Sequence, residues 1–246
     1  SLDPHKADLV GISISAKIGY AYYIPIGHKK GNNVVEKDLI KIFKPILEDA
    51  SIKKIGQNIK FDFIILYKRG IKMNSMEDTM LMSYVLDAGK NRHNMDTLSK
   101  IHLNHSPISY KDLVGTGKKQ INFSDVEISV AKNYAAEDAD ITFRLYKIFS
   151  KKLKEEKLYG IYEIFEKPLI EILSMMEIKG VKIDQSFLKK LSTKFQKKIE
   201  KLEIEIFKLS KKKFKIGSPK QLGEIMYNDL KIANTKKTKK GSFATS

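Results

Sequence analysis

The hydrophobic positions in the first part of the chain follow two different periods. Residues 9–15 (LVGISIS) and 20–26 (YAYYIPI) are short β-rich runs separated by a glycine, which predicts two neighbouring strands in a hairpin. Over residues 36–47 the apolar side chains recur at helical spacing after an acidic start, which predicts a helix. Residues 53–57 predict a third strand, and the helix that follows is expected to stop at Gly70. Because strands alternate with helices, we expect an α/β fold with helices packed on a mixed sheet.

The second half of the chain is predicted to be mainly helical. After the first strands, the next run with strand character is 181–183. Residues 186–213 place apolar side chains three or four apart with lysines between them, which predicts one long amphipathic helix. We therefore divide the chain into a domain over residues 1–160 and a second segment over 161–246. The lysine-, glycine- and serine-rich tail at 235–246 is predicted to be a mobile loop.

The charge balance points to a polyanionic partner. The chain has 46 lysines and arginines against 29 acidic residues, a formal net charge of +17. Such an excess favours nucleic acid as the partner, with a merely solvated lysine surface as the alternative. Arg69, Arg92 and Arg144 are the only arginines, so lysine supplies nearly all of the positive charge and would neutralise phosphates as a point charge.

Composition also limits the chemistry. The chain has no cysteine, which excludes disulfides, thiolate metal sites and a cysteine nucleophile. No apolar run approaches the roughly 20 residues that a membrane-spanning helix needs. With five histidines and no glycine-rich phosphate loop, the most plausible catalysis uses carboxylates and a divalent metal ion.

Two of the acidic segments follow strand-like runs. In IGQNIKFD a strand end delivers Gln57 and Asn58, and the next helical turn presents Asp62. In MEDTMLMSY, Asp78 directly precedes a helix, and we interpret it as a structural N-cap. An aspartate after a strand is more often a cap than a metal ligand, so neither segment alone establishes a site.

A third segment, YAAEDAD, places Tyr134 and Asp138 four residues apart and therefore on one helical face. This pair suits phosphodiester hydrolysis, since a carboxylate can hold a metal while a phenol orients the attacking water. An acidic cluster on a helix is more often a solvated face. The histidines without metal-ligand spacing, which we expect to be surface or hydrogen-bonding residues, are His28, His93, His102 and His105.

The order of several longer segments carries a family resemblance. The segments are AYYIPIGH at 21–28, FKPILEDA at 43–50, GQNIKFD at 56–62, EDTMLMSYVL at 77–86, RHNMDTLS at 92–99, YAAEDADIT at 134–142, EKPLIEILSMMEIKGVKID at 166–184 and FKIGSPKQLGEIMYNDL at 214–230. Together they resemble the 3′-to-5′ exonuclease region of family A, polymerase I-like DNA polymerases. The resemblance covers essentially the whole chain, and it implies a ribonuclease H-like mixed sheet followed by a helical segment that leads into a polymerase thumb.

The resemblance implies a two-metal hydrolysis of the terminal phosphodiester of DNA during proofreading. Asp138 matches the ligand of the first metal ion, Asp62 the carboxylate that serves the second largely through water, and Tyr134 the tyrosine that positions the nucleophilic water. The implied cofactors are two divalent metal ions, Mg²⁺ or Mn²⁺. The implied partners are a single-stranded 3′ end and primer–template DNA, with a monomeric protein and no membrane.

Further positions match residues that touch the DNA. Leu2 matches a leucine that wedges against the last base, and Tyr110 an aromatic residue that packs on the single strand. Aromatic and apolar faces stack on any base, which suits an enzyme that degrades any frayed end. The positions that match contacts to the terminal nucleotides are Gln57, Asn58, Phe61 and Arg92.

One departure from the family concerns the first motif. That motif is Asp-x-Glu on the strand immediately before a Ser-Leu-Asp segment, and this chain opens with Ser1, Leu2 and Asp3. Asp3 is a poor substitute, because it lies beyond the wedge leucine. We therefore expect this chain by itself to bind divalent ions poorly and to hydrolyse DNA slowly or not at all.

The resemblance also assigns the two segments of the chain. Residues 1–160 match the exonuclease domain, and residues 161–246 match a connector and the base of the polymerase thumb. The implied enzyme is a DNA-directed DNA polymerase whose polymerase activity belongs to the parent protein. The lysine and isoleucine bias makes the chain most similar to plastid (apicoplast) replicative members of the family in malaria-type parasites. A bacterial-type cytoplasm or another organelle is the alternative.

Three other functions remain open from the sequence. An RNA-processing exonuclease of the same superfamily would share the catalytic segments but place helical RNA-binding modules in the C-terminal half. A catalytically inactive exonuclease-like scaffold would support a polymerase and bind DNA through its lysines. A nonspecific binding module would depend on charge alone and lose affinity steeply with salt.

Overall fold

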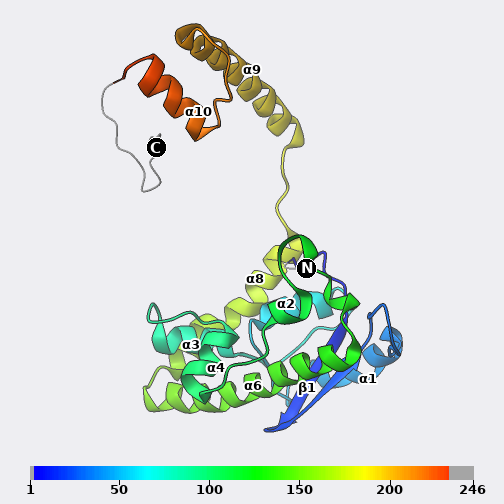
Figure 1. Cartoon of the computed structure of the whole chain (residues 1–246). Helices are drawn as coiled ribbons and strands as arrows, with labels where there is room; N and C mark the ends of the chain where they lie inside the picture. The colour runs from blue at the N-terminus through cyan, green and yellow to red at the C-terminus, as the bar shows by residue number, and fades with distance from the viewer. Residues whose placement is uncertain (1–2, 233–246) are drawn as a thin grey trace. The chain divides into compact units, whose positions relative to one another are not determined.

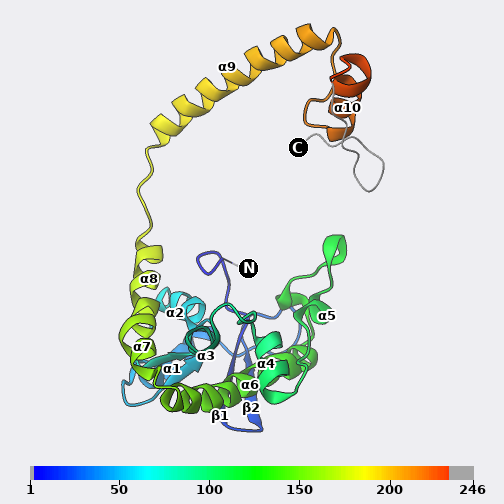
Figure 2. The same cartoon turned by 90° about the vertical axis from the view of Figure 1, so that its left-hand side faces the viewer.

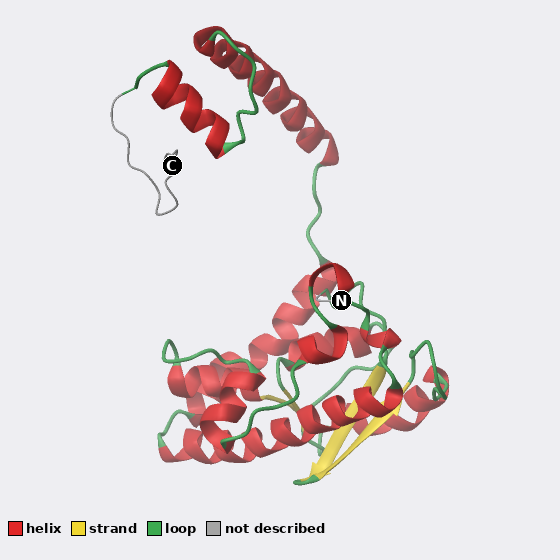
Figure 3. Cartoon of the chain, in the orientation of Figure 1, coloured by secondary structure: helices red, strands yellow, loops and turns green. Residues whose placement is uncertain are grey.

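Helices make up most of the chain, and its strands are few and short (Figures 1 and 3). The computed structural model describes residues 3–232, so the predicted wedge residue Leu2 and the predicted tail lie outside the described residues. The chain divides into two compact units, Ser1–Gly180 and Val181–Ser246.

The N-terminal hairpin forms as predicted. Strands β1 (Gly11–Lys17) and β2 (Tyr20–Pro25) pair antiparallel, with Ile12 opposite Ile24. Gly19 turns the chain between them with a φ of 82°, a left-handed conformation that glycine adopts without a Cβ clash.

A second, parallel ladder lies deeper in the first unit. Strand β3 (Lys54–Gly56) was predicted, and it pairs with β4 (Met76–Asp78), which the hydrophobic pattern did not reveal. The sequence Met-Glu-Asp has no apolar alternation, and all three residues of β4 are buried. The predicted α/β class with both strand orientations is confirmed, but among the described residues the strands form two separate two-stranded ladders.

The helices of the first unit pack around these ladders. Helix α6 contacts both strands of the hairpin, and α3 and α4 pack against α6 (Figure 2). The helix bounds are α1 (Glu36–Glu48), α2 (Ile59–Tyr67), α3 (Thr79–Asp87), α4 (Met95–Leu103), α5 (Tyr110–Val114), α6 (Ile128–Glu155), α7 (Tyr159–Ile161) and α8 (Lys167–Lys179), with 3-10 turns at Gly117–Lys119 and Phe123–Asp125 and a π-helical turn at Tyr162–Glu166.

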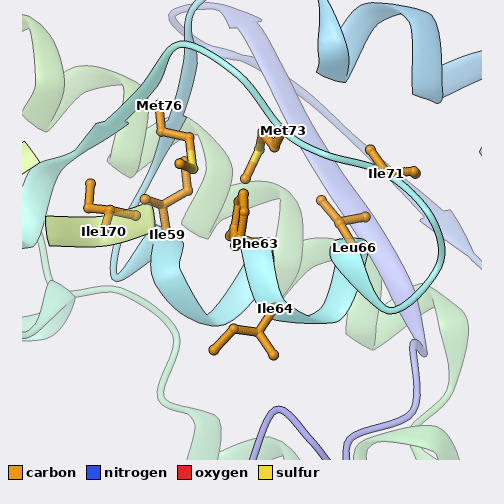
Figure 4. Close-up of a cluster of buried hydrophobic side chains, with 8 residues drawn as sticks. All are labelled: Ile59, Phe63, Ile64, Leu66, Ile71, Met73, Met76 and Ile170. Carbon is orange, nitrogen blue, oxygen red and sulfur yellow. The ribbon is translucent and has the colours of Figure 1, made fainter. Parts of the chain in front are cut away.

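Helix α2 is the centre of one apolar cluster. Its side chains Ile59, Phe63 and Ile64 are buried and lie with Met76 of β4 and Ile170 of α8 (Figure 4). A second cluster gathers side chains of α3, α4 and α6 around Tyr162. Because α2 is apolar on nearly all sides, burial fixes its position, and with it the place of the polar residues at its start.

Buried polar contacts join the π-helical turn and α8 to β4. The Glu77 carboxylate accepts from the Tyr162 hydroxyl at 3.0 Å and from Lys167 Nζ at 2.9 Å, and Lys53 Nζ lies 3.3 Å away. The Tyr162 hydroxyl also accepts from the backbone N–H of Asp78. Residues beyond 160 therefore pack within the first compact unit, and that unit extends to Gly180.

The second unit contains the long predicted helix. Helix α9 (Gln185–Ser210) ends three residues before the predicted Lys213, because Lys211 adopts a left-handed φ of 55°. Helix α10 (Pro219–Gly223) and a π-helical turn (Glu224–Asp229) follow it. The lysines that line one shallow groove on α9 are Lys190, Lys194, Lys197, Lys198 and Lys201.

The segment between the units is not a strand. Val181 and Ile183 are 90% and 66% exposed, and residues 181–183 have no regular structure. The strand character of their side chains has no neighbouring strand to pair with in the described part of the chain. No helix of the described residues is both long and apolar enough to cross a membrane.

Asp140 of α6 clamps the hairpin turn. Its Oδ1 accepts from Gly19 N at 2.6 Å and its Oδ2 accepts from Arg144 Nε at 2.7 Å. Replacing Asp140 by alanine should lower the free energy of unfolding by about 1–2 kcal/mol, because both donors lose a charged acceptor. Urea unfolding measures the change. The Lys151→Ala control removes only an exposed pair with Glu155 and should cost less than about 0.5 kcal/mol; equal losses would contradict the clamp.

Candidate active site

Tyr134 and Asp138 form the centre of the candidate site on α6. Their side chains meet one helical turn apart, as predicted, and the Tyr134 hydroxyl hydrogen-bonds the Asp138 carboxylate. Burial raises the pKa of Asp138 to about 6, and the nearby charges of Glu137 and Asp96 raise it further while the Tyr134 bond lowers it. Burial and the adjacent Asp138 also raise the pKa of Tyr134, so the phenol stays protonated at neutral pH and can donate.

Aromatic rings surround this pair on one side. The Tyr110 ring stacks on Phe123 with centroids 6.1 Å apart and an interplanar angle of 18°. Both rings lie 6.0 Å from the Tyr134 ring. Tyr110 is 44% exposed, so part of this residue reaches solvent beside the Tyr134 ring. The structure thus brings together three of the predicted site residues.

The start of α4 joins this cluster to the start of α2. Asp96, in the first turn of α4, lies close enough to Tyr134 and Asp138 to raise the pKa of both. Three residues earlier, the His93 carbonyl accepts from Gln57 Nε2 at 2.8 Å. Segments that are far apart in the sequence therefore converge on one region of the first unit.

Gln57 and Asn58 lie at the N-terminus of α2. The Gln57 amide donates to His93 O and its carbonyl accepts from the Thr79 hydroxyl, so this side chain braces α2 against α3 and the loop before α4. Asn58 has a left-handed φ of 60° and makes no side-chain cap. Asparagine tolerates that conformation better than most residues.

Asp78 caps two helices at once. Its carboxylate accepts from Met80 N and Leu81 N of α3, which confirms the predicted N-cap, and it also accepts from Asn58 N and Ile59 N at the start of α2. Asp78 is 1% exposed, and this burial raises its pKa. One carboxylate therefore fixes both helix starts, which the sequence pattern predicted for α3 only.

Asp62 lies one turn into α2, at the edge of a deep groove. The groove that Asp62 lines has a volume of about 930 Å³. Its walls include β1, residues 52–55 and the α6 side chains Phe143 and Tyr146. The Asp62 side chain reaches solvent, but surrounding protein and the charge of Asp78 raise its pKa to about 7.

The remaining predicted positions are less closely tied to the cluster. Phe61 is half-buried in the first turn of α2, and Arg92 is exposed on the loop before α4, one residue from His93. The charged groups that most affect Asp62 and Asp138 differ: Asp78 for the first, Glu137 and Asp96 for the second. Within residues 3–232 no three histidine or acidic side chains form a group that could hold a metal ion.

Sequence reasoning missed three neighbours of the site. They are Asp96, Phe123 and Glu137. The Phe123 ring contacts Tyr110 and Tyr134, and the charges of Asp96 and Glu137 raise the pKa of Asp138. The charge of Asp96 also raises the pKa of Tyr134. Asp96 and Glu137 stand inside the segments RHNMDTLS and YAAEDAD. Their position near predicted site residues in those segments could have marked them as candidates. Phe123 had no local signal, because its contacts come from elements distant in the sequence. Of the histidines, His28 is buried and bonds the Tyr23 hydroxyl and Val126 O, so it is a hydrogen-bonding and not a surface residue.

The sequence of the first unit matches a known family. Residues 1–154 match the model of the 3′-5′ exonuclease family found in family A DNA polymerases. The chain belongs to this exonuclease family. Residues 185–246 match a second model, DNA polymerase family A.

Relatives of this exonuclease-family chain are bacterial DNA polymerases I. The chain is 40% identical to that of Rhizobium leguminosarum over 267 residues, which covers 100% of the chain and 26% of the relative. It is 36% identical to that of Pseudomonas aeruginosa and 39% identical to that of Borreliella burgdorferi. These alignments cover 100% and 98% of the chain, and 28% and 26% of the relatives. The chain thus spans about a quarter of the length of the curated relatives it matches.

Solved structures agree on the fold. The POL domain of Pol1 from M. smegmatis, in complex with DNA primer-template and dNTP, superposes with a TM-score of 0.68 at 21% identity, covering 96% of this chain and 37% of that one. Brucella melitensis NrnC superposes with a TM-score of 0.57 at 23% identity, covering 73% of this chain and 81% of that one. At these identities the likeness supports the fold alone.

Proposed function

We propose that this chain is the proofreading 3′-5′ exonuclease region of a DNA-directed DNA polymerase that acts in DNA replication. The observation that carries the proposal is the Tyr134–Asp138 pair on α6 with the exposed Tyr110 ring beside it. The reaction is hydrolysis of the terminal phosphodiester at a single-stranded 3′ end. Primer–template DNA is the wider partner, and the protein acts as a monomer.

The site residues have distinct proposed roles. Asp138 and Asp62 hold two divalent metal ions, Asp62 largely through water, and the Tyr134 hydroxyl orients the attacking water. Tyr110 stacks on an unpaired base, and this stacking does not depend on which base it is. Leu2, outside the described residues, wedges against the last base. The contacts to the terminal nucleotides are assigned to Gln57, Asn58, Phe61 and Arg92.

The donor set fits hard divalent ions in part. Asp62 and Asp138 offer the carboxylate oxygens that Mg²⁺ and Mn²⁺ prefer. Their raised pKa values, about 7 and about 6, reflect desolvation and like charges, and a bound cation would relieve both. When bound, the ions would polarise the phosphate and make the attacking water more acidic. Two carboxylates are few for such a site, so further ligands are needed.

The groove beside Asp62 has room for an additional strand. β1 pairs only with β2, and β3 only with β4, among the described residues, so each has an edge left for another strand. Residues 11–16 of β1 line the groove on one side and residues 52–55 line it on another. We propose that a segment N-terminal to Ser1 pairs here, joins the two ladders into one mixed sheet, and brings the two Asp-x-Glu carboxylates beside Asp62.

A digestion experiment tests this proposal. A single-stranded oligonucleotide labelled at its 5′ end is incubated with Mg²⁺ or Mn²⁺ and either this chain or a version extended upstream through the strand-forming segment. We expect the extended form alone to shorten the DNA from its 3′ end. Products that retain the label and shrink one nucleotide at a time would establish the direction of cleavage.

An inactive scaffold is the second candidate function. It is favoured by the lack of a three-residue metal group within the described residues and by the lysines of α9. If the extended form binds single strands but does not cut them with either ion, the scaffold replaces the enzyme. Asp62, Tyr134 and Asp138 are all present, which supports a working site in the parent protein.

The division of labour along the chain is also part of the proposal. Residues 1–160 form the exonuclease domain, and residues 161–246 form the connector and the base of the polymerase thumb. The match of residues 185–246 to DNA polymerase family A supports this division over an RNA-processing exonuclease. A plastid (apicoplast) location rests on the lysine and isoleucine bias alone, with a bacterial-type cytoplasm as the alternative.

A further inference from the structure

Glu137 uses both carboxylate oxygens to hold one loop. Its Oε1 lies 2.8 Å from His105 Nε2, and its Oε2 accepts from the backbone N–H of Ile108 at 2.7 Å. The Glu137 side chain is 22% exposed and stands next to Asp138 on α6. The loop is therefore attached to α6 at two points, one on a side chain and one on the backbone.

The loop held by Glu137 leads directly into Tyr110. Helix α4 ends at Leu103, where Asn104 takes a left-handed φ of 49°, and α5 begins at Tyr110. Within residues 104–109, His105 N also bonds back to Ser99 O at 3.3 Å. Because so short a connection transmits any displacement, a loop released from Glu137 would carry the start of α5 with it.

The position of Tyr110 depends on this start. Its ring stacks on Phe123 and lies 6.0 Å from the Tyr134 ring, while 44% of Tyr110 remains exposed. An aromatic platform binds a base only when its face is free and correctly oriented, so a shift of α5 would weaken stacking. Among the described residues, the hydrogen bonds of the Glu137 carboxylate go to His105 and Ile108 and not to Tyr110.

We infer that Glu137 is a positioning residue that fixes the 104–109 loop. This loop in turn holds the Tyr110 ring beside Tyr134, in the orientation in which it stacks on a single-stranded base. The DNA-binding part of this inference rests on the proposed function. The positioning part does not, since it concerns only contacts within the chain. Glutamate suits the role because one side chain must accept from a backbone N–H and from an imidazole at the same time.

The positioning is tested on the chain itself, without metal or DNA. Since the chain has no tryptophan, Tyr110→Trp adds a single fluorescent reporter at the site. Adding Glu137→Ala should accelerate hydrogen exchange of the Ile108 amide by about tenfold or more and lower the emission anisotropy of the reporter. Glu137→Gln, which keeps one acceptor oxygen, should give a smaller change. Glu155→Ala, at the exposed end of α6, is the matched control and should change neither signal.

A binding cycle tests the consequence for DNA. We measure the affinity of a fluorescein-labelled oligodeoxythymidylate for the chain carrying Tyr110→Ala, Glu137→Ala or both. Each single change should weaken binding about threefold to tenfold, and the double change should weaken it no more than Tyr110→Ala alone, because Glu137 acts through Tyr110.

Three results distinguish a failure of the Glu137 inference from a failure of the proposed exonuclease function. Unchanged Ile108 exchange and reporter anisotropy in Glu137→Ala would overturn the inference, as would fully additive losses in the binding cycle. If the unaltered chain fails to bind single strands, the proposed function is contradicted, while exchange and anisotropy still decide whether Glu137 positions Tyr110.

Discussion

Replacing Asp138 by alanine in the upstream-extended chain is expected to reduce 3′-5′ hydrolysis of single-stranded DNA by at least about 10³-fold. The Asp138 carboxylate hydrogen-bonds the Tyr134 hydroxyl in the candidate site. Removing it takes away a proposed metal ligand and the acceptor that orients Tyr134. The rate is measured under single-turnover conditions with 5′-labelled substrate, and the affinity for the same DNA without metal is measured separately.

Two matched variants show whether the loss of activity in Asp138→Ala comes from the site itself or from a disturbed α6. Tyr134→Phe should reduce the rate less, by about 10²-fold, because the metal ligands remain and only the orienting phenol is lost. Asp140→Asn, two residues further along α6, keeps an acceptor for Gly19 N and should retain activity. Binding of single-stranded DNA should be unaffected by Asp138→Ala. A loss as large in Asp140→Asn would mean that both changes act by disturbing α6.

The largest effect on stability is expected at Asp78. Its carboxylate accepts from four backbone N–H groups, which belong to the starts of α2 and α3, and Asp78 is almost fully buried. Alanine would leave these donors without their charged acceptor at two helix N-termini. We expect the free energy of unfolding of the first unit to fall by about 4 kcal/mol, as judged from the cost of lost caps and of buried unpaired donors.

The geometry at Asp78 also predicts the order of the variants. Oδ1 accepts from Asn58, Met80 and Leu81, while Oδ2 accepts only from Ile59. Asn at this position can keep the three Oδ1 bonds, so Asp78→Asn should cost less than Asp78→Ala. Thermal and urea unfolding followed by circular dichroism measure the differences. Asn94→Ala, which removes an exposed cap of α4, should cost only about 1 kcal/mol, and an equal cost at Asp78 would contradict the double cap.

The sequence predicted the elements whose side chains follow a clear period. The hairpin, α1, β3, α2 and the long α9 were all expected within a few residues of their observed bounds. Strand β4 was not, because three buried residues that include Glu77 and Asp78 carry no alternation. The burial of Glu77 depends on Tyr162 and Lys167, which are 85 and 90 residues away. No local pattern reports such contacts.

The candidate site also contains some features that local spacing predicts and others that depend on contacts between distant elements. Tyr134 and Asp138 could be paired from their spacing, since helical geometry alone places them on one face. The neighbours of Tyr110 could not, because Phe123 and Tyr134 reach it from separate elements. The second pair of donors on Asp78 escaped prediction for the same reason, as it depends on how α2 and α3 begin side by side.

The short segment after α8 has a practical consequence for handling the protein. Gly180 closes α8 with a left-handed φ of 66°, and Asp184 caps α9 by accepting from Phe187 N at 2.9 Å. Neither helix end uses a group from residues 181–183, which are exposed. A single break in the backbone after Lys182 would therefore leave α8 and α9 each with its own terminal cap.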